Sequence, residues 1–434
     1  MACCTNLEDF YRRAGASGKI RYYPRVVFLD RQGRRSELRA WPLPAPLHLA
    51  PSFLGLPFLD WRDKRAIGRA MMRIARQHGP GPDADALSML DWLRAQGQTD
   101  AAIERVWRTV LVSALDEELD RASARYGVDV FWKAFLKNRR GFEVGIPSVP
   151  LGDLYGGCRA AIEMRGGAVR TRAAVRALRL APAAGGNPGR VSAAVLDDGA
   201  ELVADVFLSA LPHDALLDLL PPELAESEPV FSRLRGLRTS PITGVHLWLD
   251  RVVTEEPYFA LLDRTTQWIF NKTKLYSNSS AADVPVAAGA RPAVPADASS
   301  VPERAAQYLQ LVISASYSLV EKSRQEIVDL CWKEVQESLP AARSARLLKS
   351  TVVKEVAATF SPAPGSDRLR PGAHSPLQNL YLAGDWTDTG WPSTMEGAVR
   401  SGYLAAEAIL ADDGQPVAPG RLLREDLPAQ GFSR

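Results

Sequence analysis

The stretch from Asn379 to Gly402 reads NLYLAGDWTDTGWPSTMEGAVRSG, and its pattern predicts a strand, a polar loop and a helix. The apolar run over residues 380–383 is typical of a short buried strand. Ser393, with Glu396 three residues later, predicts a capping box at the start of the helix. Apolar residues then recur at helical spacing as far as Ile409.

A strand that leads into a helix N-terminus suits a ligand with an anionic or polarised edge. The N–H groups of the first helical turn point outward, and the helix dipole adds partial positive charge there. Gly384 lets a ligand approach the backbone at the end of the strand, and Asp385 can accept hydrogen bonds from ribose or ribityl hydroxyls. Alternatively, Asp385 only caps a loop, and Gly397 and Gly402 only allow close helix packing. The residues alone leave both interpretations open.

The blocks 383–386 and 393–402 resemble the C-terminal FAD motif of the flavin amine oxidase and phytoene desaturase superfamily. The resemblance implies FAD as cofactor. It also implies an α/β fold, with an N-terminally incomplete FAD-binding domain of the glutathione-reductase type beside an α+β substrate domain. In that superfamily the Gly-Asp pair meets the pyrophosphate and ribityl chain, and the helix start meets the flavin edge. The implied cofactor-binding residues are Val175, Gly384, Asp385, Trp386, Thr394, Met395 and Glu396.

Two points about this residue set stay open. Val175 is the best match to the strand residue whose backbone meets the adenine in such folds. Glu396 has the alternative role of only capping its own helix. The sequence offers no obvious triad or carboxylate pair, so no catalytic residue is assigned.

The order of predicted elements indicates a chain that crosses twice between two domains. Residues 1–145 form the first part of the substrate domain, a helical lobe, and 146–215 the middle part of the FAD-binding domain. Residues 216–350 form the second part of the substrate domain, with a flexible insertion over 277–304. Residues 351–411 complete the FAD-binding domain, and 412–434 form a tail.

The elements themselves follow from hydrophobic period and turn signals. We expect helices over residues 5–14, 61–76, 83–96, 99–119, 128–136, 156–165 and 323–337. We expect strands over residues 21–30, 35–40, 169–172, 175–180, 191–196, 201–206, 205–212, 240–250, 267–272, 308–314 and 347–359. Asp198-Gly199 is the strongest hairpin signal in the chain. Trp107 and Trp132 are expected to pack in a core.

The segment from Pro42 to Asp60 is apolar, interrupted by prolines and nearly uncharged. It reads as a buried part of the helical lobe or, alternatively, as a membrane-facing entrance for an apolar substrate. No apolar run reaches the ~18 residues that a membrane-spanning helix needs. We therefore expect a cytoplasmic protein, with peripheral contact to the inner membrane face as a further expectation.

Composition excludes several classes of site. The net charge of +3 over 434 residues gives no case for nucleic-acid binding. The four cysteines show no CxxC spacing, which favours reduced thiols in a cytoplasmic protein. The five histidines are far apart in sequence and form no HxxxH or HExxH pattern, so no metal is expected.

The chain also resembles one particular family within this superfamily. The segments 92–97, 107–115, 120–123, 240–242 with 246–248, and 353–355 with 358–360 resemble the squalene-associated FAD-dependent desaturases, also called hydroxysqualene dehydroxylases, of bacterial hopanoid biosynthesis. The resemblance implies reductive removal of the hydroxyl from hydroxysqualene, a long-chain isoprenoid substrate, and squalene-pathway enzymes as partners. Thr394 stands where amine oxidases commonly have an aromatic residue of an amine cage, so an amine substrate is disfavoured.

One departure from this family bears on function. No Gly-x-Gly-x-x-Gly turn, which would cradle the pyrophosphate, is found in the sequence. The expectation is that a first βαβ unit is missing, through a late start assignment or a truncated gene. Two alternative functions stay open: a desaturase of polyprenyl or carotenoid chains, and a non-catalytic remnant or scaffold.

Overall fold

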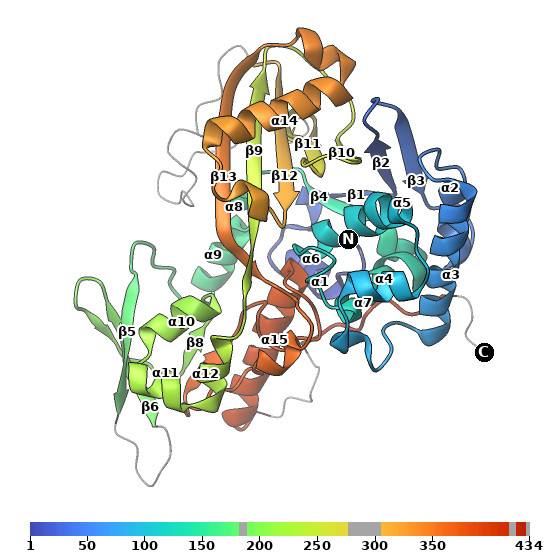
Figure 1. Cartoon of the computed structure of the whole chain (residues 1–434). Coiled ribbons are helices and arrows are strands. Elements are labelled where there is room, and N and C mark those ends of the chain that lie inside the picture. The colour runs from blue at the N-terminus through green and yellow to red at the C-terminus, as the bar shows by residue number, and fades with distance from the viewer. Residues whose placement is uncertain (182–188, 277–304, 416–421, 431–434) are drawn as a thin grey trace.

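The computed structural model describes residues 1–181, 189–276, 305–415 and 422–430. The expected insertion at 277–304 lies outside these residues. Figure 1 shows a large sheet at one end of the molecule, a small sheet with short helices at the other, and a lobe of helices beside both. The long strands β9 (Thr239–Leu249) and β13 (Leu347–Phe360) run between the two ends.

The large sheet has seven strands in the order β13-β9-β12-β11-β10-β2-β3. All neighbours in it are antiparallel except β10 and β2. Its remaining strands are β2 (Arg25–Leu29), β3 (Arg35–Arg39), β10 (Tyr258–Leu261), β11 (Trp268–Asn271) and β12 (Gln307–Ser314).

One face of this sheet is covered by helix α14 (Arg324–Ser338), which begins in a capping box of Ser323 and Glu326. Val245, Leu247 and Leu249 of β9 join residues of α14 in one buried apolar cluster. The side chains between them in sequence, such as His246 and Trp248, point to the opposite face. We call this second face, which α14 does not cover, the open face. Alternation along a strand produces the two faces, as the pattern over 240–250 predicts.

The smaller end contains a three-stranded antiparallel sheet of β5 (Val175–Ala181), β6 (Arg190–Leu196) and β7 (Glu201–Leu202), with its turn at Asp198-Gly199 as expected. Beside it, β8 (Phe207–Ser209) pairs in parallel with β14 (Leu380–Leu382). Helices α10 (His213–Leu219), α11 (Pro222–Ser227) and α12 (Pro229–Leu234) complete this end. Among the described strands, β8 and β14 pair only with each other.

The helical lobe has one core, which includes Trp107, Phe131 and Phe142. Its helices are α2 (Ala50–Leu54), α3 (Trp61–Gln77), α4 (Met89–Ala95), α5 (Asp100–Ala102), α6 (Thr109–Leu115) and α7 (Ala124–Phe131), with π-helical turns at Ile103–Arg108 and Trp132–Leu136. Trp107 is fully buried, which confirms its core role. Trp132 is half-buried and packs edge-on against His78.

The other described elements connect these parts. They are helices α1 (Thr5–Arg13), α8 (Leu151–Leu154), α9 (Gly156–Glu163), α13 (Lys272–Tyr276) and α15 (Met395–Asp412), and strands β1 (Ile20–Tyr23) and β4 (Val144–Pro147), which pair antiparallel. None of the described helices combines the length and the apolar character needed to cross a membrane.

Several sequence-based bounds were wrong for identifiable reasons. The strand expected over 21–30 is two strands that separate at Pro24, which lacks the N–H that a sheet requires. The helix expected over 83–96 begins only at Met89, after the N-cap Ser88. The helix expected over 99–119 ends at Leu115, because Asp116 adopts a left-handed conformation with φ 51°. Residues 169–172 form no strand.

The tail expected over 412–434 is in part bound to the body of the protein. The Arg424 N–H donates to Asn6 Oδ1 at 2.7 Å, and the Gln430 N–H donates to the Lys137 carbonyl at 2.8 Å. Residues 422–430 therefore run from α1 to the helical lobe as a strap.

Candidate active site

A cavity of about 370 Å³ lies at the carboxyl ends of the parallel strands β8 and β14. Such an edge is the usual ligand site of α/β sheets. The cavity brings together three segments that are distant in sequence. It is lined by residues 210–215, by Thr239 with residues 357–360, and by Gly384, Asp385 and Trp386. Three of the predicted cofactor-binding residues therefore line one cavity.

Gly384 has a conformation that a residue with a side chain adopts only under strain. Its φ is +134°, and a Cβ there would lie 2.4 Å from Nε1 of Trp386. Its N–H donates to Ser401 Oγ at 2.8 Å, which fastens the end of β14 to helix α15. The Ser393 hydroxyl donates to the half-buried Asp385 carboxylate. These contacts fix the loop that separates β14 from α15.

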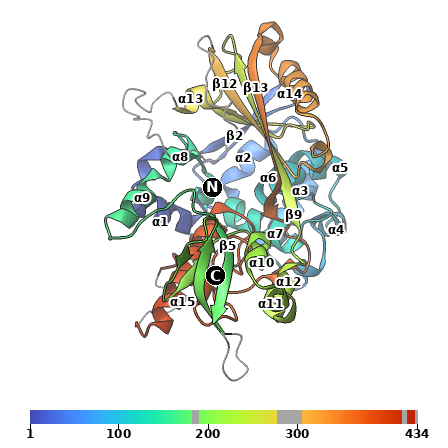
Figure 2. The same ribbon diagram turned by 90° about the vertical axis from the view of Figure 1, so that its left-hand side faces the viewer.

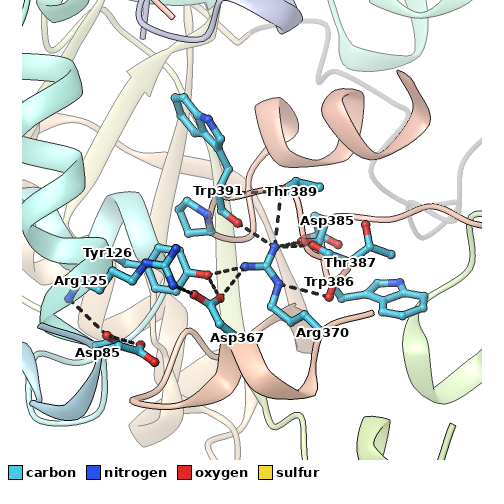
Figure 3. A network of polar contacts seen from close by, with 12 residues as sticks. Asp85, Arg125, Tyr126, Asp367, Arg370, Asp385, Trp386, Thr387, Thr389 and Trp391 are labelled. Carbon is cyan, nitrogen blue, oxygen red and sulfur yellow. Dashed lines mark hydrogen bonds and ion pairs between the residues drawn. The ribbon is translucent and has the colours of Figure 1, made fainter. Parts of the chain in front are cut away.

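Arg370 is the buried residue that holds this loop together (Figure 3), and sequence analysis did not single it out. Its guanidinium donates to the backbone carbonyls of residues 385, 386, 387 and 391, at 2.8 Å for Trp391. It also donates to the Tyr126 hydroxyl and forms an ion pair of 3.0 Å with Asp367. No local pattern marks Arg370, because its partners come from elements that meet only after folding.

Trp386 is buried, and its indole N–H donates to the Leu211 carbonyl at 2.9 Å. The structure therefore gives this side chain a packing role at the cavity wall. Met395, by contrast, is 52% exposed at the first turn of α15. The hydroxyls of Tyr155 and Tyr11 lie 3.4 and 3.9 Å from its sulfur atom. The exposed start of α15 is thus flanked by two phenols.

The capping box predicted for Ser393 and Glu396 is wrong. Helix α15 is capped by Thr394, whose Oγ1 accepts from the Gly397 N–H at 3.1 Å. The fully buried Glu396 turns to helix α1 instead, where it accepts from the Leu7 N–H at 2.7 Å and from Asn6 Nδ2 at 2.8 Å. Burial raises the pKa of Glu396, although these donors oppose the rise. The contact of Glu396 with helix α1 therefore replaces the local contact that the capping box would have made.

Val175 lies apart from the residues just described. It is the first residue of β5, on the three-stranded sheet, and it packs against the apolar cluster that contains Leu382 and Trp386. The structure therefore connects Val175 to the cavity through shared packing. Its contact with an adenine stays a prediction.

A second cavity, of about 290 Å³, lies in the helical lobe and has almost entirely apolar walls. Its lining includes residues between Pro46 and Phe58. This part of the apolar segment 42–60 therefore lines the interior of the lobe, which agrees with the interpretation of the segment as a buried part of the helical lobe. Leu47, Leu54 and Met72 both line this cavity and are 40–50% exposed. They mark its mouth.

The open face of the large sheet is rich in aromatic side chains. The rings of Trp248 and Tyr308 stack with centroids 4.8 Å apart and planes 6° apart. Trp268 and Phe270 stack beside each other on β11. Tyr308 also exchanges a hydrogen bond of 2.7 Å with Nδ1 of His246. Figure 2 shows α13 on this side of the sheet and α14 on the other.

The site at the start of α15 fits the flavin cofactor that the sequence pattern implies. Ser209, the last residue of β8, has a buried hydroxyl with no hydrogen-bond partner among the described residues. The first turn of α15, where Met395 is exposed, adds the partial positive charge of a helix N-terminus. These groups and the cavity at the strand ends can hold a phosphorylated, hydroxyl-rich ligand whose ring system has a polar edge.

Comparison with known proteins agrees with this arrangement. Residues 13–410 match the family model described as flavin containing amine oxidoreductase. The chain is 27% identical over 420 residues to a 15-cis-phytoene desaturase of Solanum lycopersicum, covering 94% of this chain and 67% of the relative. It is 26% identical over 427 residues to a zeta-carotene desaturase of Synechocystis, covering 95% and 86%.

Solved structures with the same fold include an oxidoreductase from Methanosarcina mazei, with a TM-score of 0.65, 15% identity and coverage of 94% and 85%. A second is the cyclohexylamine oxidase from Brevibacterium oxydans, with a TM-score of 0.60, 14% identity and coverage of 95% and 86%. The family match spans most of the chain. The chain therefore belongs to the flavin-containing amine oxidoreductases, a family of FAD-dependent enzymes with this α/β fold.

Proposed function

We propose that this enzyme acts on a long-chain isoprenoid, and that its reaction is the reductive dehydroxylation of hydroxysqualene to squalene. The apolar cavity in the helical lobe carries the first part of the proposal. A squalene chain offers only hydrocarbon to its surroundings, and an interior lined by aliphatic and aromatic side chains gains from covering it. Relatives named as carotenoid desaturases support an isoprenoid substrate.

The second part of the proposal rests on the polar groups of the open face. His246, Tyr308 and Lys272 gather there among aromatic rings. His246 and Tyr308 hydrogen bond to each other, but a purely hydrocarbon substrate would leave the Lys272 ammonium without a hydrogen-bond acceptor among the described residues, whereas an alcohol can supply one. Desaturation of a polyprenyl or carotenoid chain is the second candidate reaction, and the names of the relatives favour it.

FAD supplies hydride chemistry when it is bound, and this chain's own residues hold it. We propose that Gly384 and Asp385 meet the pyrophosphate and ribityl part, that Thr394 and Met395 meet the ring edge, and that Val175 meets the adenine. We propose the corresponding division into FAD-binding parts, 146–215 and 351–411, and substrate-binding parts, 1–145 and 216–350.

Product analysis separates the two reactions. The purified, FAD-loaded enzyme is incubated with hydroxysqualene under reducing conditions and with phytoene under oxidising conditions, and the products are identified by mass spectrometry. We expect squalene from the first incubation and unchanged phytoene from the second. Added double bonds in phytoene, with no squalene, would establish the desaturase instead. A flavin absorbance spectrum of the purified 434-residue chain precedes both incubations.

We also propose that the enzyme takes its substrate from the cytoplasmic face of a membrane, beside other squalene-pathway enzymes. The exposed side chains Leu47, Leu54 and Met72 surround the mouth of the apolar cavity. Helix α3, which lines that mouth, also exposes Arg65 and Arg69. Apolar side chains flanked by arginines suit an anionic lipid surface.

Vesicle sedimentation tests this surface. We expect binding to vesicles that contain phosphatidylglycerol and weaker binding to phosphatidylcholine alone. The double variant Arg65→Glu/Arg69→Glu should lose the preference, while its flavin content stays unchanged. Equal binding of both proteins to both kinds of vesicle would reject this surface.

A further inference from the structure

Lys272 lies on the open face of the large sheet at the point where β11 passes into α13. Trp268, Phe270 and Lys272 alternate along the chain and so share this face. The Lys272 ammonium lies 5.6 Å from the centroid of the Phe270 ring and 5.2 Å from that of Tyr276. Among the described residues no carboxylate pairs with it. A lysine that is half-buried among aromatic rings is unusual unless its charge has a use.

The face around Lys272 contains further polar groups that lack partners. Trp248 Nε1 and Thr351 Oγ1 are more than nine-tenths buried and make no hydrogen bond among the described residues. Thr351 lies opposite His246 in the pairing of β13 with β9, and Trp248 lies opposite Tyr308 in the pairing of β9 with β12. Buried donors and acceptors without partners are groups that a polar atom of an incoming ligand can satisfy.

This face is linked to the start of α15 through helix α8 and the residue that follows it. Helix α8 connects the two regions: the carboxylate of its Asp153 acts on Tyr276, where it adds to the effect of burial in raising the pKa to about 12. Tyr155, which directly follows α8, contacts Met395. Helix α8 and Tyr155 thus link the open face to the start of α15.

We propose that Lys272 is the proton donor to the hydroxyl of an allylic isoprenoid alcohol bound on the open face. This inference rests on the function proposed above, for which no acid has been assigned. It makes Lys272 a catalytic residue, because its ammonium touches the leaving oxygen.

The loss of the hydroxyl as water balances in atoms and charge, and it needs no protein group other than Lys272. The C–O bond breaks, its electron pair stays with the oxygen, and that oxygen takes the Lys272 proton and leaves as water. Lys272 becomes a neutral amine while the allylic carbon becomes a cation, so the total charge on the face does not change. The aromatic rings beside Lys272 stabilise that cation. FAD in its reduced form, held as proposed above, would supply the hydride that this cation needs to become squalene.

The electrostatics of the face suit this role. Burial lowers the pKa of Lys272 to about 8, close to the pH at which a general acid works best. The titratable groups on this face include His246 on β9, Tyr308 on β12, Tyr276 on α13 and Lys349 on β13, which lies over the Trp248 ring, with Asp153 on α8 beyond Tyr276. Burial lowers the pKa of His246 to about 4, and the Lys272 charge adds to this effect. His246 is thus neutral at pH 7 and does not compete as an acid.

The test is an anaerobic single turnover. FAD-loaded enzyme is reduced, mixed with hydroxysqualene, and followed both by flavin reoxidation and by squalene formed. We expect Lys272→Met to lose at least ~100-fold in rate, the usual contribution of a general acid. Lys272→Arg should be equally slow, because it keeps the positive charge but cannot release a proton near neutral pH. Flavin content and melting temperature confirm that each variant is folded.

Lys274→Met is the matched control, since Lys274 belongs to the same short helix but is exposed and pairs with Glu255. It should keep the wild-type rate. In a second readout, the wild-type rate should fall as pH rises through about 8, whereas the residual rate of Lys272→Arg should not change there. Added methylammonium should restore part of the rate to Lys272→Ala.

The outcomes are distinguishable. A wild-type enzyme that makes squalene, together with a Lys272→Met variant of equal rate, would overturn this proposal and leave the proposed function intact. A wild-type enzyme that makes no squalene but desaturates phytoene would overturn both. Loss of rate in Lys272→Met and Lys272→Arg, but not in Lys274→Met, would support both.

Discussion

Arg370 and Lys272 are both shielded from solvent, and their surroundings differ. Arg370 is fully buried and surrounded by acceptors: four backbone carbonyls, the Tyr126 hydroxyl and the Asp367 carboxylate (Figure 3). Lys272 is half-buried, lies between aromatic rings and pairs with no described carboxylate. The first cation is satisfied by the fold, whereas the second is not.

The difference separates a structural charge from a reactive one. A buried charge with a complete set of acceptors holds the elements that supply them, and its removal leaves those acceptors without a partner. A desolvated charge without acceptors raises the energy of its own charged form and so releases its proton more readily. We therefore expect Arg370 to matter for folding and cofactor retention, and Lys272 to matter for chemistry.

Arg370→Met should have the largest effect on stability. It removes the donor to the loop of residues 385–391, leaves four carbonyls without that donor, and takes from Asp367 one of its three partners. We expect the free energy of unfolding to fall by ~4 kcal/mol and bound flavin to be lost. Urea denaturation and the flavin-to-protein absorbance ratio measure these changes. Wild-type values for both would show that Arg370 does not hold the loop.

Asp367→Asn should have a smaller effect of the same kind. Asp367 accepts from Arg370, Arg125 and the Tyr126 hydroxyl, and asparagine keeps its shape without its charge. We expect a loss of ~2 kcal/mol in the free energy of unfolding. Asp197→Asn is the control, because its ion pair with Arg176 is solvent-exposed and worth less than ~1 kcal/mol. Equal losses from both variants would contradict the comparison.

Lys272→Met should act in the opposite direction on stability. The substitution removes a charge that has no described anionic partner and keeps an unbranched side chain against Phe270. We expect the free energy of unfolding to stay the same or to rise by ~1 kcal/mol. Differential scanning calorimetry is the measurement, with Lys274→Met as the exposed control. A loss of ~2 kcal/mol or more would indicate a structural role for Lys272.

The pH dependence of stability gives the smallest and most specific effect. The pKa of Lys272 is about 8 in the folded protein and ~10.4 in an unfolded chain. Between these values the unfolded state holds a proton that the folded state lacks, so stability rises with pH in this window. Wild type should therefore gain stability relative to Lys272→Met from pH ~8 to ~10. Parallel curves would mean that the Lys272 pKa is not lowered.

Local sequence patterns predicted much of the sheet. The alternation in β9 set its two faces, and Asp198-Gly199 set the hairpin, because both signals act within a few residues. Element ends were less predictable where a single residue decides them, as Asp116 does at the end of α6. Three of the predicted cofactor-binding residues, Gly384, Asp385 and Trp386, do line one cavity.

The roles of the side chains that organise the site could not be predicted from the local sequence pattern. The hydrogen-bond acceptors of Arg370 are carbonyls up to 21 residues away in sequence and the hydroxyl of Tyr126 in the helical lobe. Glu396 matched a local cap but is bound by Asn6 and Leu7. Lys272 did carry a signal, since it extends the alternation of Trp268 and Phe270, but a charged residue at a strand end is usually solvated.

The contact between Glu396 and helix α1 has a consequence for synthesis on the ribosome. The N–H groups of Asn6 and Leu7 at the start of α1 receive their acceptor from a residue 390 positions later, and Arg424 adds a further contact from the strap. Such distant contacts form late and slow the completion of a fold. Helix α1 therefore emerges without its cap, and its contacts are completed only after Glu396 and Arg424 have been translated.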